Sequence, residues 1–215
     1  MAITLRAALL IVSTTASEDP ATDRCESSLR EVFEDPSSGT ARWELSDVKI
    51  VSDDVLQIQR AITSWIDSND PVNLIITSGG TGFANKDVTP EAVSPLLHKH
   101  APGLVHGMLA ASLAVTPFAI MSRPVAGVRN RSLILTLPGS PSGARENLEA
   151  VVKLLPHACV QAAGADSREL HAGGTQRLER EAGVAAGSAA QGGRSAGRAH
   201  DHGHGHGHHL SLIHI

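Results

Sequence analysis

The chain has only two cysteines, no dense run of basic residues and no long apolar segment, and each absence narrows what it can be. Cys25 and Cys159 lie far apart among 215 residues and form no CxxC pattern, so we expect two reduced thiols in a cytosolic protein. The formal net charge is -4 without clustered lysine or arginine, which argues against nucleic-acid binding. No apolar run approaches the roughly 20 residues that a membrane-spanning helix needs. These absences favour a cytoplasmic protein with neither a membrane nor a nucleic acid as partner.

Large apolar residues are almost missing from the last part of the chain. From position 163 onward, Gly, Ala, Ser, Arg and His dominate until the final few positions. Such a composition cannot bury a core. We therefore predict one globular domain at residues 1–165 and a disordered tail or linker, rich in Gly, Ala, Ser and His, at residues 166–215. The apolar start of the chain is too short for a signal peptide and predicts a first core strand instead.

Apolar runs of strand type alternate with amphipathic helical stretches through the predicted domain. Residues 7–13 form a continuous apolar run, which is typical of a strand buried on both faces of a parallel sheet. The alternation predicts an α/β fold with a mostly parallel sheet that helices cover on both sides. The expected strands are residues 7–13, 43–51, 72–77, 117–122 and 132–137. The expected helices are residues 21–34, 55–66, a segment from about residue 90, and residues 103–115 and 144–159.

The stretch at residues 74–91 joins a strand to a helix through a glycine-rich loop. Gly79, Gly80 and Gly82 can take backbone angles that other residues avoid, so successive N–H groups can converge on one concavity. We expect the following helix to begin with Thr89 as its cap, then proline, then an acid in the first turn. The loop is therefore predicted to hold an anion such as a phosphate.

Polar residues also follow the other strands at the same predicted edge of the sheet. Serine and threonine dominate residues 13–17, and Asp53 follows the second strand. Ligands of open α/β sheets bind outside the carboxyl ends of the strands, so these groups should lie on the side where the glycine loop emerges. Asp53 could equally cap the helix at residues 55–66 by accepting a backbone N–H, and the two roles are compatible.

Several stretches, taken together and in order, resemble the molybdopterin adenylyltransferase family, which includes MogA-like and MoaB-like proteins and the G domain of gephyrin. Each motif alone is weak, but the resemblance covers nearly all of residues 5–163 and includes loops at several separate strand ends. The matching stretches are residues 78–83 (SGGTGF), 87–91 (DVTPE), 116–117 (TP), 122–128 (SRPVAGV), 137–140 (LPGS) and 155–157 (LPH).

The resemblance implies a Rossmann-like three-layer α/β/α domain, usually trimeric, that transfers AMP from ATP to molybdopterin with Mg2+ and releases pyrophosphate. The product would pass to a molybdenum insertase domain or protein. By motif position, Asp53 and Asp87 are implied to take part in catalysis. The residues expected at the nucleotide and pterin sites, with Ser13 added from its place after the first strand, are Ser13, Ser78, Gly79, Gly80, Thr81, Gly82, Glu91, Ser122, Pro138, Gly139 and Ser140.

The chemistry of these residues agrees with adenylyl transfer. Both reacting groups are phosphates, so positioning and charge neutralisation carry most of the catalysis. Magnesium prefers oxygen ligands and commonly binds through one or two carboxylates plus substrate phosphates, and Asp53 and Asp87 could supply those carboxylates. Lys86 or Arg123 could add positive charge.

Two positions depart from the family pattern. The family commonly has Ser-Asp after the first strand, where this chain has Ser13-Thr14, and an arginine where this chain has Lys86. Lysine keeps the charge but loses the planar fork that grips a phosphate through two hydrogen bonds. These departures motivate an alternative hypothesis, a non-catalytic molybdopterin-binding or gephyrin-like scaffold protein on the same fold.

The predicted tail contains a histidine cluster at residues 200–209 (HDHGHGHGHH). Imidazole nitrogens in such a cluster can bind zinc, copper or nickel. A flexible linker or a tag-like segment is the alternative interpretation, and the sequence favours it.

Overall fold

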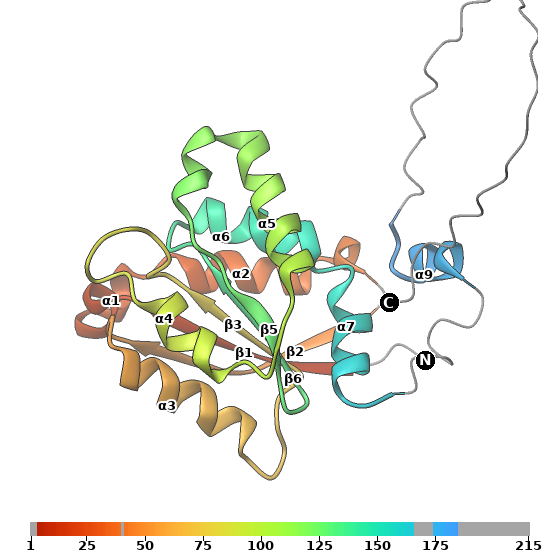
Figure 1. Ribbon diagram of the computed structural model, residues 1–215, viewed down its shortest axis with the longest axis horizontal. Helices are drawn as coiled ribbons and strands as arrows, with labels where there is room; N and C mark the ends of the chain where they lie inside the picture. Colours follow the sequence, from red (N-terminus) through yellow and green to blue (C-terminus); the bar gives the residue numbers. More distant parts are fainter. Residues whose placement is uncertain (1–3, 40, 166–173, 185–215) are drawn as a thin grey trace, which may run out of the picture.

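The computed structural model, which describes residues 4–39, 41–165 and 174–184, places helices on both faces of a six-stranded sheet (Figure 1). The strand order is β2-β1-β3-β6-β5-β4. The first four strands of this order run parallel, and β5 pairs antiparallel with both β6 and β4. The strands are β1 (Thr4–Val12), β2 (Arg42–Val51), β3 (Leu74–Ser78), β4 (Lys99–His100), β5 (Ala126–Arg129) and β6 (Ser132–Leu137).

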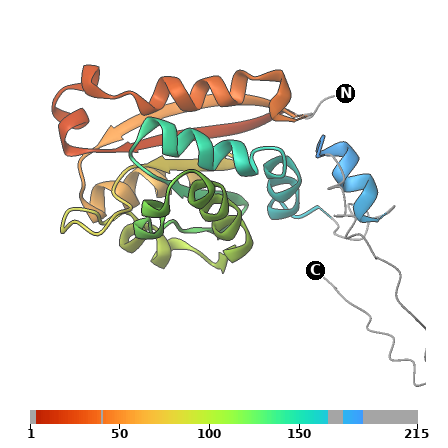
Figure 2. The same ribbon diagram turned by 90° about the horizontal axis from the view of Figure 1, so that it is seen from above.

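The helices divide between the two faces of the sheet, as the two views show (Figures 1 and 2). One face is covered by α2 (Cys25–Glu34), α5 (Pro102–Val115), α6 (Pro141–Val151) and α7 (Leu155–Ala162). The other is covered by α3 (Val55–Ile66) and α4 (Thr89–Val93). A short helix, α1 (Thr14–Glu18), follows β1, and α9 (Thr175–Glu181) lies beyond the main body. The predicted three-layer α/β/α fold is confirmed.

The central strand β1 is buried on both faces, as its continuous apolar run predicts. Leu9 packs with the α2 and α6 side of the core, while Leu10 packs with the α3 side, and neither side chain is exposed. Burying a leucine of this kind stabilises the fold by about 1.5–3 kcal/mol. The carboxyl end of β1 at Val12 is therefore held in place by the core on both sides, and the glycine loop packs against it.

Three predicted elements differ from the structure. Residues 117–122 were expected to form a strand, but Pro117–Met121 is a 3-10 helix (η4), because Thr116 caps it by accepting from the N–H of Phe118 at 3.3 Å. The strand lies later, at β5, between the two strands that were expected at residues 117–122 and 132–137. The helix expected at residues 144–159 is divided into α6 and α7, and the one expected from residue 21 begins at Cys25 after a separate 3-10 turn.

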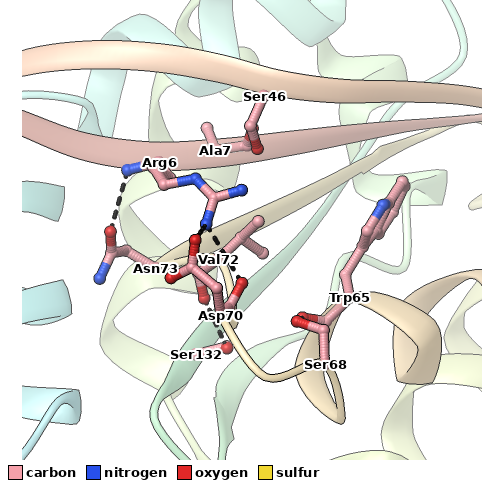
Figure 3. Close-up of polar contacts among 9 residues, drawn as sticks. All are labelled: Arg6, Ala7, Ser46, Trp65, Ser68, Asp70, Val72, Asn73 and Ser132. Atoms are coloured by element: carbon pink, nitrogen blue, oxygen red, sulfur yellow. Dashed lines mark hydrogen bonds and ion pairs between the residues drawn. The ribbon is translucent and has the colours of Figure 1, made fainter.

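The amino ends of the strands are joined by a polar cluster (Figure 3). Asn73 accepts from the Arg6 N–H at 2.9 Å, and the Arg6 guanidinium pairs with Asp70. The Ser132 hydroxyl donates to the Val72 carbonyl at 2.6 Å. A pocket of about 330 Å³ opens beside Arg6 and Asp70. It lies at the end of the sheet away from the glycine loop, and its polar side chains bond to one another or to nearby backbone carbonyls.

Among the described residues, no helix has the length and apolar content needed to cross a membrane. The thiols of Cys25 and Cys159 are free, as the sequence predicts, and both are buried. The histidine cluster at residues 200–209 lies outside the described residues. The domain boundary near residue 165 stays a prediction.

Candidate functional site

The glycine loop starts where β3 ends, and its first residue fits against β1. Gly79 has a φ of 112°, and a Cβ at this position would lie 2.1 Å from the carbonyl oxygen of Val12. Gly80 has a φ of 64°, which L side chains rarely adopt. The Gly79 N–H donates to the Leu137 carbonyl at 3.1 Å. The loop can therefore pass between the ends of β1 and β6 only because it is made of glycine.

Thr89 holds this loop from the far side. Its hydroxyl donates to the Gly79 carbonyl at 2.7 Å, and its N–H donates to the Gly80 carbonyl at 3.0 Å. The prediction that Thr89 caps α4 was wrong, because Thr89 is the first residue of that helix and Val88 precedes it without a side-chain cap. The hydroxyl is used instead to tie the loop to the helix, which fixes the path of the backbone.

Asp53 faces the loop and does not cap the following helix. That role belongs to Asp54, whose Oδ1 accepts from the Gln57 N–H at 2.8 Å. Asp53 Oδ2 accepts from both the N–H and the hydroxyl of Thr14, each at 2.8 Å. Its Oδ1 lies 3.4 Å from the point where a Cβ on Gly80 would sit. The carboxylate therefore bridges the end of β1 and the glycine loop.

Asp87 approaches the same loop from its other end. Its Oδ2 accepts from the Ala84 N–H at 2.8 Å and lies 2.7 Å from the point where a Cβ on Gly82 would sit. Asp53 and Asp87 are both partly buried. Within the described part of the chain, neither Oδ1 accepts a hydrogen bond. The two predicted acids therefore flank one loop, each with an oxygen left for a ligand.

These free oxygens fit a magnesium ion, although they do not enclose one. Magnesium usually keeps several waters and takes one or two carboxylates together with substrate phosphates. Among the described residues, no group of three or more His, Cys, Asp and Glu side chains is placed to hold a metal ion. Asp53 and Asp87 could thus be only part of a magnesium shell that water and phosphate oxygens would complete.

Arg123 binds both ends of the 82–87 segment. Its guanidinium donates to the carbonyl of Gly82 at 2.9 Å and to that of Asp87 at 2.8 Å, and it forms an ion pair with Glu91. The hydrogen bonds from Arg123 hold the pKa of the Glu91 carboxyl below its usual range, because they favour the ionised form. Arg123 therefore shapes the loop rather than offering a free charge, and Lys86 is exposed.

A pocket of about 210 Å³ opens at the carboxyl ends of β1 and β3. Ser13, Ser78 and Gly139, three of the residues expected at the substrate sites, line it. The Ser13 hydroxyl caps α1 by accepting from the Ala16 N–H at 3.2 Å, and the Ser78 hydroxyl donates to the Pro138 carbonyl at 2.8 Å. The residues that position this pocket are therefore already bonded to the backbone of neighbouring loops.

The other predicted residues lie around this centre. The Thr81 carbonyl accepts from the Arg123 N–H at 2.9 Å, which places Ser122 beside the glycine loop. The Ser122 hydroxyl is buried and has no hydrogen-bond partner within the described residues. Ser140 is exposed at the start of α6. Substrate-binding roles for all of the predicted residues, and catalytic roles for Asp53 and Asp87, stay predictions.

A sequence model of the family described as "Probable molybdopterin binding domain" matches residues 8–157 of this chain. The chain belongs to this family. Molybdopterin adenylyltransferase from Helicobacter pylori strain J99 is 39% identical over 138 residues, which are 60% of this chain and 77% of that protein. The Escherichia coli K12 protein of the same name is 35% identical over 148 residues, 69% of this chain and 74% of that protein.

A much longer relative matches as well. Gephyrin from Dictyostelium discoideum is 49% identical over 110 residues, which are 51% of this chain but only 15% of gephyrin. Among solved structures, the molybdopterin biosynthesis enzyme MoaB from Thermus thermophilus superposes with a TM-score of 0.67 at 41% identity, covering 74% of this chain and 97% of that one. MogA superposes with a TM-score of 0.66 at 33% identity, covering 74% and 99%.

Two residues that line the pocket, Asp23 and Arg24, were not predicted from the sequence. Arg24 lines the pocket, is exposed and is the N-cap residue of α2. The carboxylate of Asp23, just before it, accepts from the N–H groups of Cys25 and Glu26, each at 3.0 Å. The sequence signal was present, because a charged Asp-Arg pair precedes the first apolar residue of a helix. It was overlooked because residues 21–34 were interpreted as one continuous helix.

Proposed function

We propose that the chain is a molybdopterin adenylyltransferase, which transfers AMP from ATP to molybdopterin and releases pyrophosphate in molybdenum cofactor biosynthesis. The observation that carries this proposal is the placement of Asp53 and Asp87 against Gly80 and Gly82 of one loop, each with a free carboxylate oxygen. The names of the relatives from Helicobacter pylori and Escherichia coli support the same activity.

The loop and the pocket would divide the work of binding. Backbone N–H groups of the glycine loop and of the α6 N-terminus suit phosphate oxygens. The pocket beside Ser13 and Ser78 would hold part of the pterin or of the nucleotide, and Arg24 would offset phosphate charge at its rim. Holding two anionic substrates in line is the main task, since orientation removes much of the barrier to phosphoryl transfer.

Magnesium would be held by the free oxygens of Asp53 and Asp87 and, when bound, would supply the positive charge that neutralises the phosphates. The protein groups contribute a fixed geometry. Thr14 donates two hydrogen bonds to Asp53, and Arg123 binds the carbonyls at both ends of the segment that carries Asp87. Adenylyl transfer requires the two carboxylates at fixed positions, because a small displacement of a catalytic group lowers the rate by a large factor.

The direct test is product formation. The purified chain, incubated with molybdopterin, ATP and magnesium, should form adenylyl-molybdopterin and an equal amount of pyrophosphate. If both substrates bind at saturation and neither product accumulates, the proposed activity is wrong.

A binding protein without catalysis is the second candidate, and the 49% identity to gephyrin favours it. Titration with molybdopterin separates the possibilities. An adenylyltransferase binds molybdopterin saturably and turns it over with ATP, whereas a molybdopterin-binding scaffold binds it without turnover. A scaffold whose site has decayed shows no saturable binding.

An exposed apolar patch supports the homotrimer that the family resemblance implies. We define the patch as Leu113, Val115, Phe118, Ile120 and Met121, at the end of α5 and along η4. No Asp, Glu, Lys or Arg occurs between Ala101 and Ser122. A helix that is apolar on most sides is normally buried. We therefore propose that this patch lies in a homotrimer interface.

A molybdenum insertase domain or protein would receive the product, and a cytoplasmic location stays a prediction.

A further inference from the structure

Thr14 directs both of its hydrogen-bond donors at one carboxylate oxygen. Its backbone N–H and its hydroxyl each reach Asp53 Oδ2 at 2.8 Å. Thr14 follows the end of β1, while Asp53 follows the end of β2, so the two bonds join neighbouring strand ends. Hydrogen bonds to a charged acceptor are stronger than those between neutral groups. The two hydrogen bonds from Thr14 therefore restrain the Asp53 side chain more firmly than one hydrogen bond between neutral groups would.

The hydroxyl of Thr14 is also fully used. Ser52 Oγ lies 2.8 Å from Thr14 Oγ1, and the Asp53 N–H approaches the same oxygen at 3.4 Å. A hydroxyl has one donor and two acceptor positions. Because its single proton goes to Asp53, the Ser52 hydroxyl must be the donor in the Ser52–Thr14 bond. The result is a chain of donors that runs from Ser52 through Thr14 to Asp53.

This chain determines which oxygen of Asp53 remains for a ligand. Oδ2 is saturated by Thr14, while Oδ1 is the oxygen beside Gly80 and accepts no hydrogen bond from the described residues. An aspartate at position 14, the residue expected from the family resemblance, could not donate from its ionised side chain. It would place a second negative charge against Asp53. Threonine removes that repulsion and lowers the negative charge where anionic substrates must bind.

We propose that Thr14 is a positioning residue that fixes Asp53 so that only Oδ1 faces the glycine loop, where it takes one coordination position of a divalent cation. This inference rests on the adenylyltransferase function proposed above. It concerns a hydrogen bond of this chain that neither the family match nor the names of its relatives assign.

Three variants test the proposal. Thr14→Val keeps the side-chain shape and removes the hydroxyl, Thr14→Ser restores the hydroxyl, and Asp53→Asn marks complete loss of the carboxylate. The first measurement is the χ1 angle of Asp53 from three-bond NMR couplings in the ligand-free protein, with the amide spectrum confirming that each variant is folded. We expect a single rotamer in the wild type and in Thr14→Ser, and averaging between rotamers in Thr14→Val.

The second measurement is Mn2+ binding, followed by electron paramagnetic resonance as a probe of the cation site. Thr14→Val should bind Mn2+ several-fold more weakly than the wild type, and Thr14→Ser should bind within about twofold of it. In steady-state assays, Thr14→Val should lower kcat about tenfold with little change in the KM for molybdopterin, because the substrate contacts are intact.

The outcomes separate the two proposals. A single Asp53 rotamer in Thr14→Val would mean that the backbone N–H of residue 14 is sufficient, and it would overturn the positioning role of the Thr14 hydroxyl, whatever the activity. A rotamer change with wild-type Mn2+ affinity would overturn the cation part. If the wild type forms no adenylyl-molybdopterin, the proposed function fails, while the rotamer measurement still decides whether Thr14 positions Asp53.

Discussion

Arg24 is the only cationic side chain among the described residues that line the pocket beside β1 and β3. A guanidinium there would offset the charge of a bound phosphate. We predict that Arg24→Gln weakens binding of molybdopterin or ATP about tenfold and makes the affinity less sensitive to salt. Isothermal titration at two ionic strengths measures both effects.

Arg60→Gln is the matched control for this prediction, because Arg60 is an exposed arginine on α3, away from the pocket. It should bind both substrates as the wild type does. Equal affinities and equal salt dependence for Arg24→Gln and the wild type would exclude Arg24 from the site.

Glu91 gives a prediction about pH. Arg123 lowers its pKa, so its ionised form stabilises the folded state. The stabilisation by the ionised Glu91 carboxyl is complete above the pKa of glutamate in the unfolded chain, about 4.3. It is lost as the pH falls through the lower pKa that Glu91 has in the folded protein. Because the side chain is half exposed, Glu91→Gln should destabilise the protein by less than about 1 kcal/mol at pH 7.

The difference between Glu91→Gln and the wild type should shrink from pH 7 to pH 3, because the wild-type carboxyl takes up protons as the pH falls through its lowered folded pKa. Urea unfolding at the two pH values measures it, and Glu34→Gln, an exposed glutamate of α2, serves as the control. A loss of stability of the same size at both pH values would mean that the Glu91–Arg123 ion pair is not its source.

Single residues were the hardest part of the site to predict. Asp53 and Asp87 could be selected because an acid after a strand or a glycine loop is visible in the sequence. The hydrogen-bond partner of Asp53 could not be predicted. Thr14 is 39 positions away in the sequence and lies next to Asp53 only when β1 and β2 pair. For the same reason, Arg123 was predicted as a free charge although it binds the glycine loop.

At the scale of elements, the glycine loop is the most constrained segment. A Cβ on Gly79 would meet the Val12 carbonyl oxygen at 2.1 Å, and the residue has a positive φ. We predict that Gly79→Ala destabilises the protein by about 2–4 kcal/mol, through backbone strain and overpacking. Chemical denaturation followed by circular dichroism measures this change.

Gly103→Ala provides the matched control. Gly103 lies in α5, and nothing is within 4 Å of the place where its Cβ would be. Alanine there should be neutral or stabilise by up to about 1 kcal/mol, because alanine is the better helix former. If both variants lost the same stability, the tight fit of the loop against β1 would be refuted.

The strands that contain continuous apolar runs were predicted well, whereas those that depend on a partner were not. β1, β3 and β6 lie close to their expected positions, since buried parallel strands carry a strong apolar signal. The edge strand β2 also lies close to its expected position, although none of its residues is fully buried. β5 and β4 are short, and Gly127 of β5 is required because a Cβ would lie 2.3 Å from the Lys99 carbonyl oxygen. Such a contact between strands leaves no pattern in the sequence.

At the scale of the whole molecule, the exposed apolar patch makes a prediction about assembly. Phe118 and Ile120 are each 74% exposed. The double variant Phe118→Ser with Ile120→Ser should dissociate the proposed trimer, because removing two large apolar side chains from an interface weakens it strongly. The monomer should stay folded, because neither side chain contributes to the core.

Light scattering coupled to size exclusion measures the mass of that double variant. Leu56→Ser is the control, since Leu56 is a 59% exposed leucine on α3, outside the patch. It should leave the mass unchanged. A wild-type chain that is monomeric at high concentration would contradict the assignment of the patch to a trimer interface.

The central claim is that Asp53 and Asp87 act on phosphates held by one glycine loop, and a single-turnover comparison tests it most directly. Formation of adenylyl-molybdopterin is measured for the wild type, Asp87→Asn and Asp67→Asn, an acid at the end of α3 that serves as the control. We predict that Asp87→Asn binds both substrates within a few-fold of the wild type but turns over at least about 100-fold more slowly. Asp67→Asn should match the wild type. Wild-type turnover in Asp87→Asn, with saturated substrates, would contradict the account.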